Sequence, residues 1–411
     1  MVDPQSLKLE AAVMSELNQI KYLVGSKKFE TRPLKPYNKI TCDFLSEFSK
    51  KLNLEKNINQ ISDLKALAFW CRKQNIDYLV KKSKCDDARV GLGLIFHITP
   101  SNIATNFIYS LFFGLLTGNS NIVKISSKYT LQSDIICKCL NKLLLQKKFQ
   151  TLKNRITVVR YEDNDNFTKE ISLKCNLRII WGGDRTINAI RKFNLSPSSS
   201  DITFSDRSSI CLINSKSLIK TSEFKMSILV QKFYNDTYLV DQNACSSPHI
   251  IFWIGNKKDN KFAQKKFWDN LYKQVKKRYI LDESSAVDKY SNLCKKINLL
   301  ENNCDFIKYG NLIYILKMKK LTNNLDEIRG KWGLFFEYET QNPIMITKFL
   351  NKKFQTLTYY GLNKNFYKKL IIDNLTSGID RIVPIGQALD ISLNWDGFDL
   401  NKSLTRIIEV K

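Results

Sequence analysis

The spacing of apolar residues divides the chain into a charged first part and a more regular second part. In residues 1 to about 85, apolar positions recur at helical spacing over 7–23 and 64–80. From Arg89 onward, short apolar runs alternate with amphipathic stretches. This change of pattern predicts that an α/β domain begins near that residue.

The second part opens with four predicted strands and four predicted helices. The strands are expected at 90–98, 121–126, 155–161 and 177–181, and the helices at 107–116, 131–146, 167–174 and 185–193. Because strands and helices alternate, the pattern favours βαβ units in a doubly wound parallel sheet. Ligands bind such sheets at the carboxyl ends of the strands, which here are followed by loops at 97–105, 126–130 and 181–185.

The rest of the chain continues in the same mixed style. A helix is predicted at 223–234, a strand at 250–254, and a lysine-rich, solvent-facing helix at 257–278. The tail contains turns with Pro, Gly and Trp from Arg381 onward. We interpret it as a docking or oligomerisation arm rather than a free domain.

The chain is strongly basic, with a formal net charge of +26. Its lysines are spread along the sequence together with Asn, Ile and Phe, and they form no basic stripe, zinc-finger spacing or RNA-binding signature. We therefore expect no nucleic-acid partner. The basic surface is interpreted as solvated, or as one that attracts acidic partners such as CoA phosphates or an acidic carrier protein.

The ten cysteines show no regular spacing. Cys137 and Cys139 form a C-x-C without the second ligand pair that a zinc site needs, so no metal site is expected. No signal peptide is recognisable, which predicts free thiols in a cytoplasmic protein. The most apolar run, 106–118, is too short to span a bilayer.

One cysteine lies in a setting suited to chemistry. The segment 241–249 reads Asp-Gln-Asn-Ala-Cys-Ser-Ser-Pro-His, and its Cys245 is flanked by small polar residues at a predicted junction between helix and strand. Since only a thiolate attacks a carbonyl, we expect backbone amides or positive charge to lower the pKa of Cys245. The alternative is a buried, inert cysteine.

Five segments, in order, resemble the LuxC-type acyl-CoA reductases, a bacterial family of the aldehyde dehydrogenase superfamily that makes fatty aldehyde for luminescence. They are GLIFHITPSN (93–102), SLFFGLLTGNSN (110–121), WGGD (181–184), QNACSSP (242–248) and RIVPIGQALD (381–390) with WDG (395–397). The resemblance covers roughly residues 88–411.

The resemblance implies an aldehyde dehydrogenase-like α/β fold, in which a Rossmann-like doubly wound cofactor domain is followed by a second α/β domain that carries the thiol, and by an oligomerisation arm. We place a helical N-terminal region at 1–85, the nucleotide-binding domain at 86–235, the catalytic domain at 236–370 and the arm at 371–411.

The resemblance also implies roles for single residues. Cys245 corresponds to the nucleophile that accepts the acyl group. Asn102 stands where the superfamily has the asparagine of its oxyanion hole, and the backbone N–H of Cys245 would be the second donor. The alternative for Asn102 is a capping residue in the turn after a strand.

The cofactor residues follow in the same way. Lys124 corresponds to a lysine that binds the adenosine ribose. Ser127, followed by Lys128, occupies a position at which many NAD-preferring members carry a glutamate, so the resemblance implies NADPH, with NADH still acceptable. Gly182 and Gly183 form a turn at which backbone can approach a pyrophosphate. Asp184 beside them remains undecided.

One departure from the superfamily bears on the reaction. Our register places Thr203 where hydrolytic aldehyde dehydrogenases have a glutamate base, so water would be poorly activated to cleave an acyl-enzyme. His97 and His249, the two histidines of the chain, could each assist proton transfer or could be hydrogen-bonded structural residues.

Together these residues predict an acyl-CoA or acyl-protein thioester reductase that makes fatty aldehyde, with an acyl-protein synthetase partner and a homo-oligomeric state implied by the resemblance. Two alternatives stay open. One is a CoA-independent aldehyde dehydrogenase, which needs a base in place of the missing glutamate. The other is a non-catalytic, polyanion-binding protein with the same fold.

Overall fold

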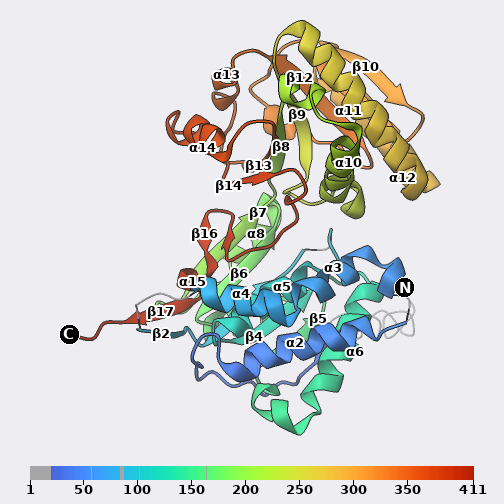
Figure 1. Cartoon of the computed structure of the whole chain (residues 1–411). Helices are drawn as coiled ribbons and strands as arrows, with labels where there is room; N and C mark the ends of the chain where they lie inside the picture. Colours follow the sequence, from blue (N-terminus) through green and yellow to red (C-terminus); the bar gives the residue numbers. More distant parts are fainter. Residues whose placement is uncertain (1–19, 57, 84–87, 101, 163) are drawn as a thin grey trace, which may run out of the picture. The chain divides into compact units, whose positions relative to one another are not determined.

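The structure is a computed structural model of the 411-residue chain, and it describes residues 20–56, 58–83, 88–100, 102–162 and 164–411. The chain forms two compact units (Figure 1). Unit 1 contains the described residues up to Ser205 together with Phe398–Lys411, and unit 2 is Asp206–Gly397. The division therefore falls at Ser205 rather than at residue 235, and the described part of the first 85 residues belongs to unit 1.

Unit 1 is built on a six-stranded sheet in the order β1-β5-β4-β3-β6-β7. Its strands are β1 (Lys21–Val24), β3 (Leu94–Ile98), β4 (Ser120–Ile125), β5 (Ile156–Arg160), β6 (Leu177–Gly182) and β7 (Ser200–Ser205). β1 is antiparallel to β5, and the other strands pair in parallel. All five residues of β3 are buried, which explains why it reads as a continuous apolar run.

Helices connect these parallel strands as the alternating pattern predicts. The connecting helices are α5 (Asn106–Leu116), α6 (Leu131–Leu144), α7 (Asp165–Lys174) and α8 (Asp184–Arg191), and the helices before the sheet are α2 (Lys39–Asn53), α3 (Ser62–Trp70) and α4 (Lys73–Ser83). Short 3-10 helices lie at η1 (Ile58–Gln60) and η2 (Lys147–Leu152). α5 is the most apolar helix because nearly all its residues are buried. In the described part of the chain, no helix is both long and apolar enough to cross a membrane.

Three predictions for unit 1 need correction. The run at 90–98 is two strands, β2 (Ala88–Gly91) and β3, because Gly93, with φ +128°, turns the chain between them. The helical spacing at 64–80 belongs to two helices, α3 and α4. Most of the helix predicted at 7–23 lies outside the described residues, and residues 21–23 belong to strand β1.

Unit 2 is built on a seven-stranded sheet in the order β10-β11-β12-β9-β8-β13-β14. Its strands are β8 (Ser208–Asn214), β9 (Pro248–Ile254), β10 (Cys304–Tyr309), β11 (Ile313–Met318), β12 (Leu334–Thr340), β13 (Phe354–Tyr360) and β14 (Arg381–Pro384). β10 is antiparallel to β11, and the other pairs are parallel. The amino ends of β8, β9, β13 and β14 therefore lie along one edge of the sheet.

Helices cover both faces of this sheet. They are α9 (Ser215–Ile219), α10 (Glu223–Thr237), α11 (Lys257–Arg278), α12 (Glu283–Leu299), α13 (Ile344–Thr347) and α14 (Lys364–Ile372), with 3-10 helices at η3 (Tyr238–Val240) and η4 (Leu325–Glu327). Alternate residues of β9 serve two cores: Phe252 packs in the cluster that contains α12 and α14, and Trp253 packs in the cluster that contains α10 and α11.

Helix α11 has the predicted bounds but is not simply solvent-facing. Its lysines are exposed on one side, whereas Phe267, Trp268 and Leu271 are buried against the sheet. The helix is therefore amphipathic, and it has a large apolar face in spite of its high lysine content.

The tail is not a single arm. β14 joins the sheet of unit 2, β15 (Asn394–Trp395) and β16 (Phe398–Asp399) follow, and α15 (Leu400–Ser403) leads into β17 (Thr405–Ile408). β17 pairs antiparallel with β2 in a two-stranded sheet of unit 1. The expected segment 371–411 is thus divided between the two units.

Candidate active site

Cys245 lies in a tight loop between η3 and β9. The loop begins with Asp241 and Gln242 in the left-handed region, at φ 52° and 59°. The buried amide of Gln242 fixes it from both sides, because its Nε2 donates to the Pro248 carbonyl (3.2 Å) and its Oε1 accepts from the Gly333 N–H (3.1 Å). The glutamine of the motif is therefore a structural residue that shapes the loop.

The backbone at Cys245 is also held from the neighbouring strands. The Cys245 carbonyl accepts from Ser209 Oγ (2.6 Å), and that hydroxyl in turn accepts from the Thr356 N–H (3.1 Å). Ser247 Oγ donates to the Asp236 carbonyl (2.7 Å). Ser246 and Ser247 are buried, whereas Cys245 keeps partial exposure. The loop thus presents its thiol at the amino edge of the unit 2 sheet.

Two carboxylates and two guanidinium groups surround the thiol. Asp206 Oδ1 is 3.8 Å from Cys245 Sγ and accepts its hydrogen bond, and the same oxygen is 2.6 Å from Arg329 Nη1. The Arg207 side chain pairs with Asp380 and with Asp396, while its backbone N–H donates to Sγ. The site is therefore a compact network of opposite charges.

This environment raises the pKa of Cys245 to about 11. Desolvation is the largest cause, and the charges of Asp206 and Asp396 add to it, whereas the Arg207 N–H and the Arg329 charge act in the opposite direction. The expectation of a lowered pKa is wrong for this arrangement of the residues. In the structure the cysteine is a neutral thiol at physiological pH, and attack on a carbonyl requires that its proton be removed.

The position of Asp206 corrects the inference from Thr203 that the site lacks a carboxylate to activate water. Thr203 is a residue of β7 in unit 1, but a carboxylate does lie beside the thiol, supplied three positions later in the chain. The sequence reasoning missed it because the register was set by analogy with a glutamate motif. Asp206 and Arg207 follow Thr203 closely in the chain, and they supply the carboxylate and the backbone N–H that contact the Cys245 sulfur.

The segment 381–390 forms a turn that is held by the Arg381 side chain and by Asp236. The Arg381 guanidinium donates to the carbonyls of Gln387, Ala388 and Asp390 and stacks over Trp395 at 4.5 Å. The turn it forms is fixed to α10 by the buried carboxylate of Asp236. Asp236 accepts the N–H groups of Gly386 (2.6 Å) and Ala388 (2.9 Å), one on each oxygen.

We expect Asp236→Asn to destabilise the protein by about 1–3 kcal/mol, because an amide can accept on one side only and would leave a buried N–H unpaired. Burial raises the pKa of Asp236 from 3.8 to about 7, so its contribution to stability is present below pH 4 and is lost as the pH rises to about 7. Urea denaturation at pH 5 and pH 8 checks both points. The exposed Asp288→Asn serves as the control, and equal unfolding curves for the two variants would contradict the expectation.

His97 is a hydrogen-bonded structural residue, which was one of the two roles considered for it from the sequence. Its Nδ1 lies 2.7 Å from Ser110 Oγ and its Nε2 2.9 Å from Asn121 Oδ1, and Trp181 Nε1 donates to the same serine. Burial lowers the pKa of His97 to about 4, so the ring is neutral. Four residues of the quoted motifs are thus tied into one buried network of unit 1.

His249 is buried beside the site at the start of β9. Burial lowers its pKa to about 3, and the nearby charge of Arg329 lowers it further. Its Nδ1 has no hydrogen-bond partner among the described residues. Because the ring is neutral at physiological pH, it cannot serve there as an imidazolium acid.

The predicted cofactor residues come together at one edge of unit 1. β4, β3 and β6 are adjacent and parallel, so the loops after them lie side by side at their carboxyl ends. These loops carry all the residues predicted to bind cofactor, and also Asn102: they are Asn102 after β3, Lys124, Ser127 and Lys128 at the end of β4, and Gly182 and Gly183 at the end of β6. Ser101, which precedes Asn102, lies outside the described residues.

The geometry of this edge fits a dinucleotide. Gly183 is the N-cap of α8 without a side-chain cap, and a Cβ built on it would meet no atom within 4 Å. A pyrophosphate could therefore approach the helix N-terminus. Ser127 and Lys128 are exposed, and Lys124 Nζ lies 5.3 Å from the Tyr161 ring centroid. These residues belong to unit 1, whereas Cys245 belongs to unit 2.

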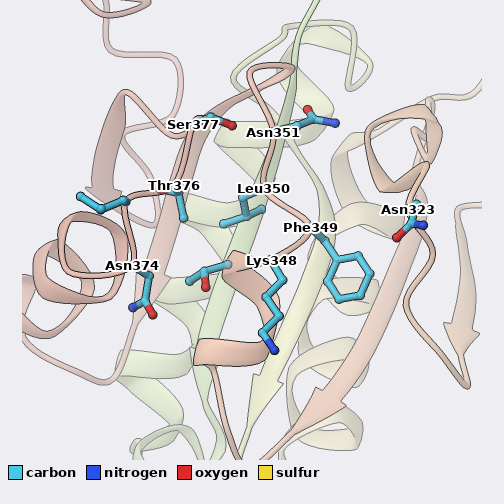
Figure 2. Close-up of a pocket in the computed structure, with 10 residues that line it drawn as sticks. Asn323, Lys348, Phe349, Leu350, Asn351, Asn374, Thr376 and Ser377 are labelled. Carbon is cyan, nitrogen blue, oxygen red and sulfur yellow. The ribbon is translucent and has the colours of Figure 1, made fainter.

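A cavity of about 390 Å³ lies elsewhere in unit 2, between the loop after α13 and the loop after α14 (Figure 2). Its lining is mostly polar, and it includes neither Cys245 nor the charged neighbours of the thiol: Asn323, Thr347, Lys348, Phe349, Leu350, Asn351, Asn374, Leu375, Thr376 and Ser377. In the described part of the chain, no group of His, Cys, Asp or Glu side chains is arranged to hold a metal ion. Cys137 and Cys139 are buried in α6.

Comparison with known sequences agrees with the family resemblance found in the sequence. The sequence profile of the acyl-CoA reductase (LuxC) family matches residues 34–292. The long-chain acyl-protein thioester reductase 2 of Photobacterium leiognathi is 24% identical over 320 residues, which make up 74% of this chain and 62% of that protein. The chain thus matches less than two thirds of the length of this relative.

Comparison with solved structures confirms the predicted fold class. The chain is similar to an oxidoreductase from Marinobacter aquaeolei, with a TM-score of 0.64 and 10% identity, covering 92% of this chain and 87% of the other. It is similar to aldehyde dehydrogenase 21 from Physcomitrella patens, with a TM-score of 0.63 and 9% identity, covering 90% and 85%. At these identities the likeness establishes an aldehyde dehydrogenase-like α/β fold and nothing further.

Proposed function

The chain belongs to the acyl-CoA reductase (LuxC) family, and from this premise we propose that it reduces an acyl thioester to an aldehyde through a covalent intermediate on Cys245. The observation that carries the proposal is the loop that holds the backbone of Cys245, a partly exposed residue, with its Sγ 3.8 Å from Asp206 Oδ1. An inert structural cysteine would need neither the exposure nor the surrounding charges.

In the proposed reaction, Cys245 gives up its proton and its sulfur bonds to the acyl carbon, while the bond from that carbon to the carrier sulfur breaks. The carrier leaves as a thiol after taking a proton. The amide of Asn102 and the N–H of Cys245 stabilise the negative charge on the carbonyl oxygen. A bound nicotinamide would supply the hydride that reduces the acyl carbon. Release of aldehyde then breaks the bond to Cys245 and restores its thiol.

Binding of the nicotinamide cofactor is assigned to the carboxyl edge of the unit 1 sheet. Lys124, Ser127 and Lys128 would hold the adenosine ribose and its phosphate, and Gly182 and Gly183 would face the pyrophosphate. The absence of a carboxylate at Ser127 and the cation at Lys128 favour NADPH, although NADH would also bind.

We expect Lys128→Glu to lower kcat/KM for NADPH about tenfold, because a carboxylate repels the 2′-phosphate, with little effect on NADH. Steady-state kinetics with both cofactors check this. Lys138→Glu on α6 makes the same change of charge at another exposed position and should leave the ratio of the two cofactors unchanged. Equal losses with NADPH and NADH would remove Lys128 from the cofactor site.

The acyl donor is proposed to be a long-chain acyl-CoA or an acyl group on a protein, delivered by an acyl-protein synthetase to a homo-oligomer in the cytoplasm. The basic surface suits acidic donors. The test is to incubate the protein with radiolabelled acyl-CoA, to locate the label by peptide mapping, and then to add NADPH. We expect label on Cys245 that is released as aldehyde; label elsewhere, or none, contradicts the proposal.

Asp206 gives weight to a second function, the CoA-independent oxidation of an aldehyde. A carboxylate beside the thiol could activate water to hydrolyse an acyl-enzyme, a reaction that the argument from Thr203 disfavoured. The two reactions differ in their products. Oxidation is the reaction if aldehyde and oxidised cofactor yield free acid without CoA, and if Asp206→Asn removes this activity. Reduction is the reaction if acyl-CoA and NADPH yield aldehyde.

A further inference from the structure

Arg329 is the charged side chain that pairs with the carboxylate nearest to the Cys245 sulfur. It lies between η4 and β12, and three contacts fix its guanidinium. Nη1 is 2.6 Å from Asp206 Oδ1, Nη2 donates to the Asp206 carbonyl (3.5 Å), and Nε donates to the Asp326 carbonyl (3.1 Å). Two of these contacts join Arg329 to Asp206, so the two residues form a close ion pair.

One oxygen of Asp206 joins the arginine to the thiol. Oδ1 accepts both from Arg329 and from Cys245 Sγ. The Asp206 side chain is 59% exposed, whereas that of Arg329 is 25% exposed. The more buried arginine is therefore the fixed member of the pair. Without it, the negative charge of Asp206 beside the sulfur would be uncompensated.

The other charged or titratable side chains near the thiol do not compensate the charge of Asp206. Arg207 is already paired with Asp380 and Asp396, and His249 is neutral. Lys331 and Lys296 lie near His249 and act on its ring. Among the described charges that act on Cys245, Arg329 is thus the cation that offsets the negative charge of Asp206.

We propose that Arg329 is a positioning residue that fixes Asp206 beside Cys245 and offsets its charge, and that the pair thereby controls whether Cys245 is a thiol or a thiolate. The proposal rests on the proposed function only for the idea that a thiolate is needed. The arrangement of charges would act on any reaction of Cys245.

The test measures the rate at which iodoacetamide alkylates Cys245 in the full-length protein between pH 7 and pH 11, with the modified peptide quantified by mass spectrometry. Arg329→Gln should move the profile to higher pH and slow alkylation about tenfold at pH 8, because an uncompensated carboxylate disfavours the thiolate. Asp206→Asn should move it to lower pH. Arg329→Lys keeps the charge and should stay close to the wild type.

Two further variants separate this role from a merely structural one. Arg329→Gln combined with Asp206→Asn removes both charges and should return the profile close to that of the wild type. Arg278→Gln, at an exposed arginine of unit 2, should change nothing. An unchanged profile in Arg329→Gln, or a double variant as slow as Arg329→Gln alone, overturns the proposal.

The outcome is independent of whether the chain reduces acyl thioesters. Alkylation needs neither acyl donor nor cofactor, so the shifts can occur in a protein that forms no aldehyde, and this result would reject the proposed function while keeping the role of Arg329. Loss of the fold is also recognisable, because an unfolded chain exposes Cys245 and is alkylated faster, with the pH dependence of an ordinary cysteine.

Discussion

Cys245→Ala is expected to abolish covalent labelling by acyl-CoA and to lower aldehyde formation by at least about 10³-fold, because the reaction loses its nucleophile and no other group at this position can hold the acyl chain. The change removes one sulfur from a loop whose shape is set by Gln242, Ser209 and Ser247. The loop should therefore keep its structure. Intact-mass measurement after incubation with acyl-CoA, together with an aldehyde assay with NADPH, provides the measurement.

The matched control is Cys294→Ala, which removes an exposed cysteine of α12 in the same unit. It should label and turn over like the wild type. Circular dichroism should show that both variants are folded. If Cys245→Ala still forms aldehyde at a tenth of the original rate, the covalent mechanism is wrong, whatever the fate of the label.

Asn102→Ala has the second largest expected effect, a loss of about 10²–10³-fold in the rate of acyl transfer, the range observed when one donor to a developing oxyanion is removed. The amide is neutral and can stabilise charge on oxygen without giving up a proton. Single-turnover labelling of Cys245 is the appropriate measurement, since it reports acyl transfer before any hydride is needed.

Asn106→Ala at the start of α5 provides the comparison, because it removes an amide of the same kind from the helix that follows the loop. A role in capping the turn would lower the thermal stability of Asn102→Ala and leave labelling of the folded protein near normal. A role as an oxyanion donor would do the reverse. The two measurements thus decide between the alternatives for this residue.

The alternation of strands and helices could be predicted from the sequence because β3, β4, β5 and β6 are buried on both faces and read as apolar runs. Strand β2 could not be separated from β3 in the same way. Only two residues lie between them, and the turn depends on the conformation of Gly93. The apolar pattern indicates which residues are buried, but it does not show where a glycine ends one strand before the next begins.

The candidate site was found where its residues are close in sequence and missed where they are not. Cys245 and its loop form one continuous segment. Asp206 comes from 39 residues earlier, and Arg329 lies 123 residues beyond Asp206. Contacts between such distant positions follow from the parallel order of the strands, which the motifs alone did not give.

The direction of the pKa shift of Cys245 could not be predicted from the sequence either. Small polar neighbours in the sequence suggested a thiolate. In the folded chain, desolvation and two carboxylates outweigh the positive charges and raise the pKa. The balance depends on how deeply each group is buried, and this cannot be read from residue types.

Strand β2 pairs with β17, which lies far from it in the sequence. Arg89 contacts Thr405 across 316 positions of the chain, and the whole of unit 2 lies between the two strands in sequence. Unit 1 therefore cannot complete the two-stranded sheet of β2 and β17 until all of unit 2 has been synthesised. Until then strand β2 has an unpaired edge, which makes the nascent chain prone to aggregation.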